Sequence, residues 1–277
     1  MGLLEHVLGT GVELQELKRK PGRRTTFRAA AGGRSAIVKL YASDRAASVA
    51  ARVKAVADGP VEMRVPEVLA VDVDRHLVVL SELPGTPLRD PLLRGNSEEC
   101  NRAGAALGAW HCHFLGLAPP GLLPHGTERE LLLLREHAET APAPFRRAVL
   151  RASARLEQSW DCRTAVHRDL YEEQVLLDER VGLIDLDDAA LGPPELDVGN
   201  LAAQIDLLGL RARKELSPGL DSLLRGYERH GPALDGQLLE ECRALSLLRL
   251  ACIHRLPELI GRALARSAPP AGSRGAA

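Results

Sequence analysis

The chain has no strong net charge and no long apolar run. Its 36 basic and 37 acidic residues leave a formal net charge of −1. Such a balance produces no long-range field that would attract nucleic acid or an anionic membrane. No run of about eighteen apolar residues is present, and the first residues lack the basic start and long apolar centre of a signal peptide. We therefore expect a cytoplasmic protein without a nucleic-acid or membrane partner.

Cysteine pairs are also missing. The five cysteines are odd in number, and no two of them form a Cys-x-x-Cys pair. This pattern favours reduced, mostly buried thiols over a disulfide framework or a zinc site. With 277 residues and 45% hydrophobic composition, the chain can bury the core of two modest lobes or of one large domain.

The stretch 166–197 is the most informative part of the sequence. Two short apolar runs, Val175–Leu177 and Val181–Ile184, are joined by Asp-Glu-Arg, which predicts two strands in a tight hairpin. Asp169 stands shortly before the first strand and Asp185 directly after the second, so pairing brings both carboxylates to the same end of the ribbon. Two such carboxylates can hold Mg²⁺ together with substrate phosphates, or one of them can accept a proton from an attacking hydroxyl.

The residues around this hairpin resemble the catalytic core of protein-kinase-like phosphotransferases. The resemblance is strongest to the aminoglycoside phosphotransferase family, which also includes small-molecule kinases such as those for choline. The residues that carry it are His167, Arg168, Asp169, Gln174, Ile184 and Asp185. Arg168 departs from the pattern, because the small-molecule members more often have glycine there.

The resemblance implies a role for each of these side chains. Asp169 would be the catalytic base or the group that orients the acceptor hydroxyl, and Asp185 would be the main Mg²⁺ ligand. Gln174 stands where the family usually has a metal-binding asparagine, and its side chain is one methylene longer. His167 would give structural support. ATP is the implied phosphoryl donor.

A further aspartate follows the hairpin after a Gly-Pro bend, as is typical of the family. This residue, Asp197, would give structural support as the resemblance implies, cap a helix that begins at Val198, or do both.

The sequence predicts five strands within the first eighty residues. Short turn signals separate the alternating segments, which predicts neighbouring antiparallel pairs. The predicted strands are Val12–Leu17, Thr25–Ala30, Ala36–Tyr41, Pro66–Val71 and His76–Leu80.

Lysine is scarce beside arginine, yet Lys39 stands among the apolar residues of the third strand. It is either an outward-facing lysine or, by the resemblance, the lysine that holds the α- and β-phosphates of ATP. The preceding loop, residues 21–26, matches no Gly-x-Gly-x-x-Gly pattern. Thr25 and Thr26 are candidate phosphate donors there.

One element of the family pattern is absent. A helix is predicted over Asp44–Ala57, but it carries no glutamate to pair with the strand lysine. Asp44, a residue outside the helix such as Glu62, or the phosphates alone would then hold Lys39. A pseudo-enzyme with weak catalysis that binds nucleotide or acts as a scaffold is the alternative that this absence suggests.

Proline and glycine mark a lobe boundary at residues 81–88. By the resemblance this is the hinge that binds adenine through backbone groups. Glu82 and Leu83 are the candidates, because Pro84 has no N–H.

We therefore predict an α+β, bilobal protein-kinase-like fold. A small antiparallel β lobe (residues 1–80) would bind nucleotide, a hinge (81–88) would follow, and a larger, mostly helical lobe (89–266) would contain the catalytic hairpin. Residues 267–277 would form a disordered tail.

The predicted activity is transfer of the γ-phosphoryl group of ATP, with Mg²⁺, to a hydroxyl of a small molecule. The acceptor would be an aminoglycoside or other antibiotic, an amino alcohol or a sugar; a peptide or peptide-derived acceptor is the alternative that Arg168 suggests, and a protein partner is also possible. Acidic residues near the hairpin would receive ammonium groups of the acceptor or form a solvated acidic loop. They are Glu172, Glu173, Asp187, Asp188 and Glu195.

Overall fold

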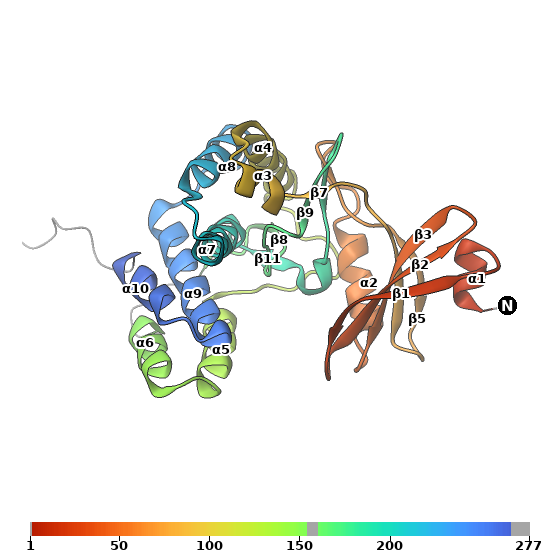
Figure 1. Ribbon diagram of the computed structural model, residues 1–277, viewed down its shortest axis with the longest axis horizontal. Helices are drawn as coiled ribbons and strands as arrows, with labels where there is room; N and C mark the ends of the chain where they lie inside the picture. Colours follow the sequence, from red (N-terminus) through yellow and green to blue (C-terminus); the bar gives the residue numbers. More distant parts are fainter. Residues whose placement is uncertain (1, 154–159, 267–277) are drawn as a thin grey trace, which may run out of the picture.

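A computed structural model of the protein describes residues 2–153 and 160–266. An antiparallel sheet with short helices forms one end of the molecule, and a group of longer helices forms the other (Figure 1). The predicted α+β, two-lobed fold is confirmed. The predicted tail, 267–277, lies outside the described residues.

The small lobe is built on one five-stranded antiparallel sheet. Its strand order is β1-β2-β3-β6-β5, and all five predicted strands are confirmed with small shifts at their ends. The strands are β1 (Glu13–Lys20), β2 (Arg24–Ala31), β3 (Arg34–Tyr41), β5 (Val68–Asp72) and β6 (Leu77–Ser81).

Helices cover both faces of this sheet. Val79 packs on the face of α1 (Leu3–Leu8), and its neighbour Val78 belongs to the core that includes α2 (Ala46–Ala55). Because successive residues of a strand point to opposite faces, Lys39 of β3, paired in register with Val78, lies on the α2 face. Only 4% of Lys39 is exposed, so the outward-facing alternative is wrong.

The predicted catalytic hairpin lies in a second, four-stranded sheet. Its strands β9 (Val175–Leu177) and β10 (Val181–Leu183) are antiparallel, as the sequence predicts. Two very short strands flank them: β4 (Met63–Arg64) beside β10 and β7 (Thr86–Pro87) beside β9. Both flanking strands come from segments that connect to the small lobe, so backbone hydrogen bonds tie the hairpin to these segments on both sides.

The large lobe is helical apart from the hairpin and one small ladder. The ladder pairs β8 (Thr164–Val166) with β11 (Ala190–Gly192). The helices are α3 (Arg89–Arg94), α4 (Ser97–His113), α5 (Thr127–Glu139), α6 (Ala143–Ser153), α7 (Pro194–Ala212), α8 (Ser217–His230), α9 (Gly236–His254) and α10 (Pro257–Arg266), and a 3-10 turn covers Leu186–Asp188. Within residues 2–153 and 160–266, none of the helices has the length and apolarity to cross a membrane.

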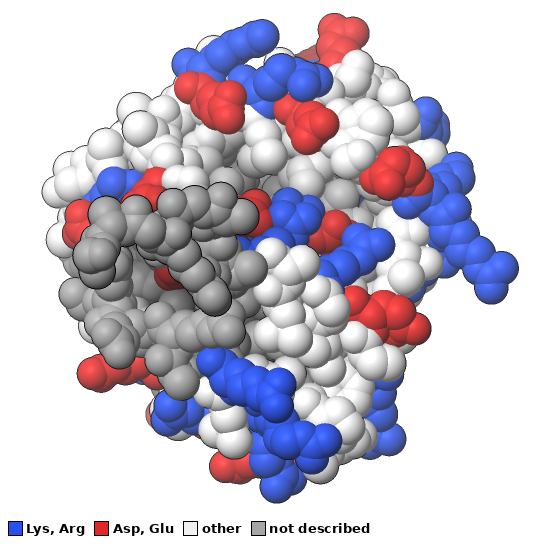
Figure 2. All heavy atoms as spheres, turned by 90° about the vertical axis from the view of Figure 1, so that its left-hand side faces the viewer, with Lys and Arg blue, Asp and Glu red and all other residues white. Residues whose placement is uncertain are grey.

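The end of the molecule formed by the large lobe carries charges of both signs. Figure 2 shows basic and acidic side chains on this face, and neither sign covers it. This distribution agrees with the net charge of −1.

One helix boundary differs from the sequence prediction. Helix α7 begins at Pro194 and not at Val198, because proline, with its fixed φ and no N–H, suits the first position of a helix. Asp197 therefore lies inside the first turn of α7, and the prediction that it caps the helix is wrong.

Helices α4 and α8 approach closely through glycine. A Cβ atom on Gly226 of α8 would lie 2.0 Å from the carbonyl oxygen of Asn101 on α4. We expect Gly226→Ala to lower the free energy of unfolding by about 1–3 kcal/mol, because the helices must move apart. Gly261→Ala in α10 is the control, since nothing lies within 4 Å of its Cβ position. Urea unfolding of both variants measures the difference, and equal stabilities would contradict this packing.

Candidate active site

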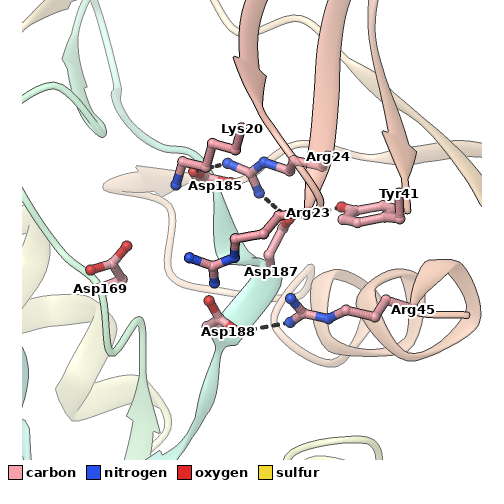
Figure 3. A pocket seen from close by; sticks show the side chains of 9 residues that line it. All are labelled: Lys20, Arg23, Arg24, Tyr41, Arg45, Asp169, Asp185, Asp187 and Asp188. Carbon is pink, nitrogen blue, oxygen red and sulfur yellow. Dashed lines mark hydrogen bonds and ion pairs between the residues drawn. The ribbon is translucent and has the colours of Figure 1, made fainter. Parts of the chain in front are cut away.

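A pocket of about 40 Å³ lies where residues of the two lobes meet. Asp169 and Asp185 both line it, so the predicted convergence of these carboxylates is confirmed, with Asp169 on the side opposite the other acids (Figure 3). The residues around it are Lys20, Arg23, Arg24, Tyr41, Arg45, Asp169, Asp185, Asp187 and Asp188.

Four charged side chains form a compact cluster, and three of them line this pocket. Lys39 Nζ lies 2.7 Å from Asp185 Oδ1 and 2.5 Å from Asp187 Oδ1. Arg24 bonds the same two carboxylates, at 2.5 Å to Asp185 Oδ2 and through its other terminal nitrogen to Asp187. Tyr41 donates a hydrogen bond to Asp187 Oδ2 at 2.8 Å. We call Lys39, Arg24, Asp185 and Asp187 the four-charge cluster; its two cations balance its two carboxylates.

The environment of the cluster sets its protonation. Burial alone would raise the pKa of Asp185, but the Lys39 ammonium and the Arg24 guanidinium outweigh burial and hold that pKa well below its usual range. Burial and the neighbouring Asp187 raise the pKa of the Tyr41 hydroxyl, so it remains a hydrogen-bond donor. Asp185 is therefore ionised at neutral pH.

Asp187 supplies the partner that the sequence lacked in the helix. Of the carboxylates in the described part of the chain, Asp185 and Asp187 lie within ion-pair distance of Lys39, and Asp44 and Glu62 do not. The predictions that named Asp44 or Glu62 are therefore wrong. The signal was the run Asp-Leu-Asp-Asp after the second strand, for whose later members the sequence predicts contact with the acceptor or a place in a solvated acidic loop.

The helix that usually carries the glutamate instead contributes arginines. Arg45, at the start of α2, bonds Asp188 Oδ1 at 2.8 Å, and Arg52 donates to the backbone oxygen of Asp187 at 2.7 Å. The helix therefore presents positive charge to the site, where the family usually has a glutamate, and the segment after β10 that it contacts is anionic. Arg168 adds a third cation, 3.7 Å from Asp188.

Asp197 holds the backbone of residues 167–170, which carry Asp169 and which we call the catalytic loop. Its carboxylate accepts hydrogen bonds from the backbone N–H groups of His167 at 2.6 Å and Arg168 at 2.7 Å. His111 reaches the same carboxylate at 3.2 Å. The His167 ring donates through Nε2 to the carbonyl of Ile184 at 2.8 Å, which links the loop to the residue before Asp185.

Two residues of the site, one in this loop and one after β10, have a strained backbone. Arg168 and Asp185 have φ values of 75° and 66°, in the left-handed region that side-chain-bearing residues rarely adopt. Such conformations persist only where surrounding bonds fix them. The bonds from Asp197 and His167 do this here.

Of the two metal ligands predicted from the sequence, Asp185 suits a metal site better than Gln174 does. Asp185 lines the pocket, and its carboxylate oxygens suit Mg²⁺, which is usually held by one or two carboxylates and substrate phosphates. Within residues 2–153 and 160–266, no three His, Cys, Asp or Glu side chains gather into a metal site without such phosphates. Gln174 is buried with its Oε1 bonded to the N–H of Tyr171 at 3.2 Å, whereas its Nε2 has no partner. Its role as second ligand remains a prediction.

The predicted nucleotide-binding residues lie along the small lobe. Thr26 is paired with Lys39 in the register of β2 and β3, and Thr25 is the residue before it. Neither threonine lines the pocket, where the neighbouring basic residues stand instead. Glu82 accepts hydrogen bonds from Arg28 Nε at 2.8 Å, and Leu83 lies against the hairpin at Gly182.

The acidic residues near the hairpin are mostly committed to cations of the chain. Glu195 is fully buried and bonds Arg163 at 2.9 Å, so it neither receives an acceptor nor belongs to a solvated loop. Asp187 and Asp188 bond the cations described above. Glu173 is exposed and lies 3.6 Å from Arg89. Burial raises the pKa of Glu172.

Comparison with known proteins identifies the fold and then the family. A thermostable mutant of aminoglycoside phosphotransferase APH(4)-Ia, solved with AMP-PNP and hygromycin B, shares 18% identity over 95% of this chain and 94% of that chain, with a TM-score of 0.64. A choline/ethanolamine kinase family protein from Mesorhizobium loti shares 18% identity over 94% and 90%, with a TM-score of 0.62. Spectinomycin phosphotransferase APH(9)-Ia, solved with ADP and spectinomycin, shares 14% identity over 96% and 91%, with a TM-score of 0.61.

These likenesses show the kinase-like fold. The profile of the phosphotransferase enzyme family matches residues 21–245, which is most of the chain. The chain therefore belongs to this family and is a phosphotransferase, and the resemblance indicated by its catalytic motif is confirmed. No curated protein sequence matches it.

The four-charge cluster predicts a large effect of one amide substitution. Asp187→Asn leaves Lys39 and Arg24 facing a single carboxylate in a site with little water, so we expect a loss of about 3–5 kcal/mol in the free energy of unfolding. Glu173→Gln, which breaks an exposed ion pair with Arg89, is the control and should cost less than about 1 kcal/mol. Denaturant unfolding of both variants tests this, and similar losses would refute the role of Asp187.

Proposed function

We propose that the protein transfers the γ-phosphoryl group of ATP to a hydroxyl group of a small molecule, with Mg²⁺ as the metal. One observation carries the proposal. Asp169 and Asp185 line the same pocket between the lobes, and Lys39 of the small lobe bonds Asp185. This is the arrangement that phosphoryl transfer needs: a group for the acceptor proton, a metal ligand and a phosphate-binding cation.

Asp169 is the residue that handles the acceptor. Its side chain is 45% exposed, and no hydrogen bond from another described residue occupies it. The acceptor hydroxyl donates its proton to this carboxylate while its oxygen attacks the γ-phosphorus, and the bond from that phosphorus to the bridging oxygen of ADP breaks. Asp169 then releases this proton to solvent.

The basic residues of the pocket bind the phosphates. Lys20 and Arg23 line it and make no ion pair with other described residues, so their charges are available to the triphosphate. A volume of about 40 Å³ holds only a few water molecules, at roughly 10–15 Å³ each, so the cations must shift when the triphosphate enters. Phosphate oxygens then compete for Lys39 and Arg24 and release the oxygens of Asp185. Mg²⁺, when bound there, neutralises charge on the phosphates.

The remaining site residues complete this assignment. Glu82 and Leu83 contact adenine through the hinge backbone, Thr25 and Thr26 lie beside the phosphate path, and Gln174 is the second metal ligand. The solved relatives include one with hygromycin B and one with spectinomycin. They support a small molecule as acceptor. The acceptor that we propose is a hydroxylated molecule from the classes of aminoglycosides and other antibiotics, amino alcohols and sugars, and the proposed location of the enzyme is the cytoplasm.

The alternative of a pseudo-enzyme loses its main support. It was suggested by the missing helix glutamate, and Asp187 bonds Lys39 in that glutamate's place. The alternative of a peptide acceptor rested on Arg168, and that side chain pairs with Asp188.

The test of this function separates binding from transfer. We expect Asp169→Asn to retain the affinity for ATP with Mg²⁺ and to lower the transfer rate about 10²–10⁴-fold, because the proton acceptor is lost. Calorimetry measures the affinity, and labelled γ-phosphate measures transfer to water and to a panel of aminoglycosides, amino alcohols and sugars. Asp178→Asn, at the turn of the same hairpin, is the matched control. Undiminished transfer by Asp169→Asn would refute the assignment.

A further inference from the structure

A buried polar network lies next to Asp169 on the side of the large lobe. Three of its members lie on helices α5, α7 and α9, and the fourth lies in the loop before α5. No member has a role in the function proposed above. They are His125, Glu130 on α5, Asn200 on α7 and Arg249 on α9, and each is at most 8% exposed.

Arg249 is the centre of this network. Its Nη2 donates to Asn200 Oδ1 at 2.7 Å, and its Nη1 lies 3.5 Å from Glu130 Oε1. His125 Nε2 donates to the other oxygen of Glu130 at 2.9 Å. Burial would raise the pKa of Glu130, but the His125 bond and the Arg249 charge hold it below its usual value. An ionised Glu130 therefore holds the Arg249 guanidinium on one side, and Asn200 holds it on another.

The network reaches both the side chain and the backbone of the catalytic loop. Arg249 Nη2 lies 3.9 Å from Asp169 Oδ1, and within the described part of the chain it is the one cation in ion-pair distance of that carboxylate. The Asn200 side chain, which accepts from Arg249, donates through Nδ2 to the carbonyl of Leu170 at 2.8 Å. Among residues 2–153 and 160–266, none donates a hydrogen bond that would otherwise fix the carboxylate of Asp169.

We propose that Arg249 is a positioning residue for Asp169: its buried guanidinium, held by Asn200 and Glu130, keeps the carboxylate turned toward the acceptor hydroxyl. A buried cation suits this task because its attraction for a carboxylate is screened less than at the surface. Arginine suits it because the planar group has enough donors to contact three partners at once. This inference rests on the proposed function of Asp169.

The test is a double-mutant cycle between Arg249→Met and Asp169→Asn. The rate followed is ATP hydrolysis with water as acceptor, and calorimetry gives the affinity for ATP with Mg²⁺. We expect Arg249→Met alone to lower kcat about 10–100-fold, as a misplaced catalytic group does, with the affinity changed less than about twofold. In the Asp169→Asn background the same substitution should have no further effect on kcat, because it acts through Asp169.

Two controls separate positioning from folding. Arg243→Met removes an equally buried arginine of the same helix, whose partner is Asp206 at 2.8 Å, and it should lower stability without lowering kcat. Arg249→Lys keeps the charge and should recover part of kcat. If Arg249→Met does not fold, Arg249→Lys replaces it in the cycle, with a smaller loss that should again vanish in the Asp169→Asn background.

Failure of the inference and failure of the function give different results. If ATP does not bind with Mg²⁺, or if Asp169→Asn hydrolyses ATP as fast as the unsubstituted protein, the proposed function is wrong and the inference falls with it. If binding and the Asp169 effect are both present, but Arg249→Met has no effect or has the same effect in both backgrounds, the inference alone is overturned.

Discussion

The four-charge cluster between the lobes is the interaction on which the candidate site depends. Lys39 and Arg24 come from neighbouring strands of the small lobe, and Asp185 and Asp187 follow the catalytic hairpin. Removing four charges from water is costly, and mutual attraction offsets that cost only because every charge has two partners of opposite sign. The same contacts that join the lobes therefore place Lys39, which we propose binds phosphate, against Asp185, which we propose binds the metal. A triphosphate with Mg²⁺ is the kind of ligand that can enter this cluster without leaving a charge unpaired.

Helix α7 fixes the backbone around Asp169, on the other side of the pocket. Asp197 and Asn200 lie three residues apart, on one face of the helix, and both bond the catalytic loop. Asp197 holds the N–H groups of His167 and Arg168, and Asn200 holds the carbonyl of Leu170. Together they fix the backbone on both sides of Asp169, including a left-handed residue. The strained conformation and its supporting bonds explain why one carboxylate and one amide are buried in the first turns of a helix.

Local patterns in the sequence predicted much of this arrangement. The five strands, the hairpin and the convergence of Asp169 with Asp185 follow from alternation and short turns, which depend on neighbouring residues. Strands β4 and β7 were missed because two-residue strands have no pattern of their own and exist through their partners. Arg249 was missed because its contact with Asp169 joins residues far apart in the sequence. The sequence indicated Asp187 as an acidic residue near the hairpin. Its pairing with Lys39 could be assigned only from the structure, which places β3 beside the hairpin.

The most direct test of a nucleotide site at the four-charge cluster is the melting temperature of the purified protein with ATP, with and without Mg²⁺. A ligand at about a hundred times its dissociation constant stabilises the folded state by roughly 2.7 kcal/mol, which raises the melting temperature by a few degrees in a chain of this size. We predict a rise that requires Mg²⁺, because Asp185 is the proposed ligand of the metal, which would take the place of the cations that bond this carboxylate. The absence of any rise at millimolar ATP would contradict a phosphotransferase site at this cluster.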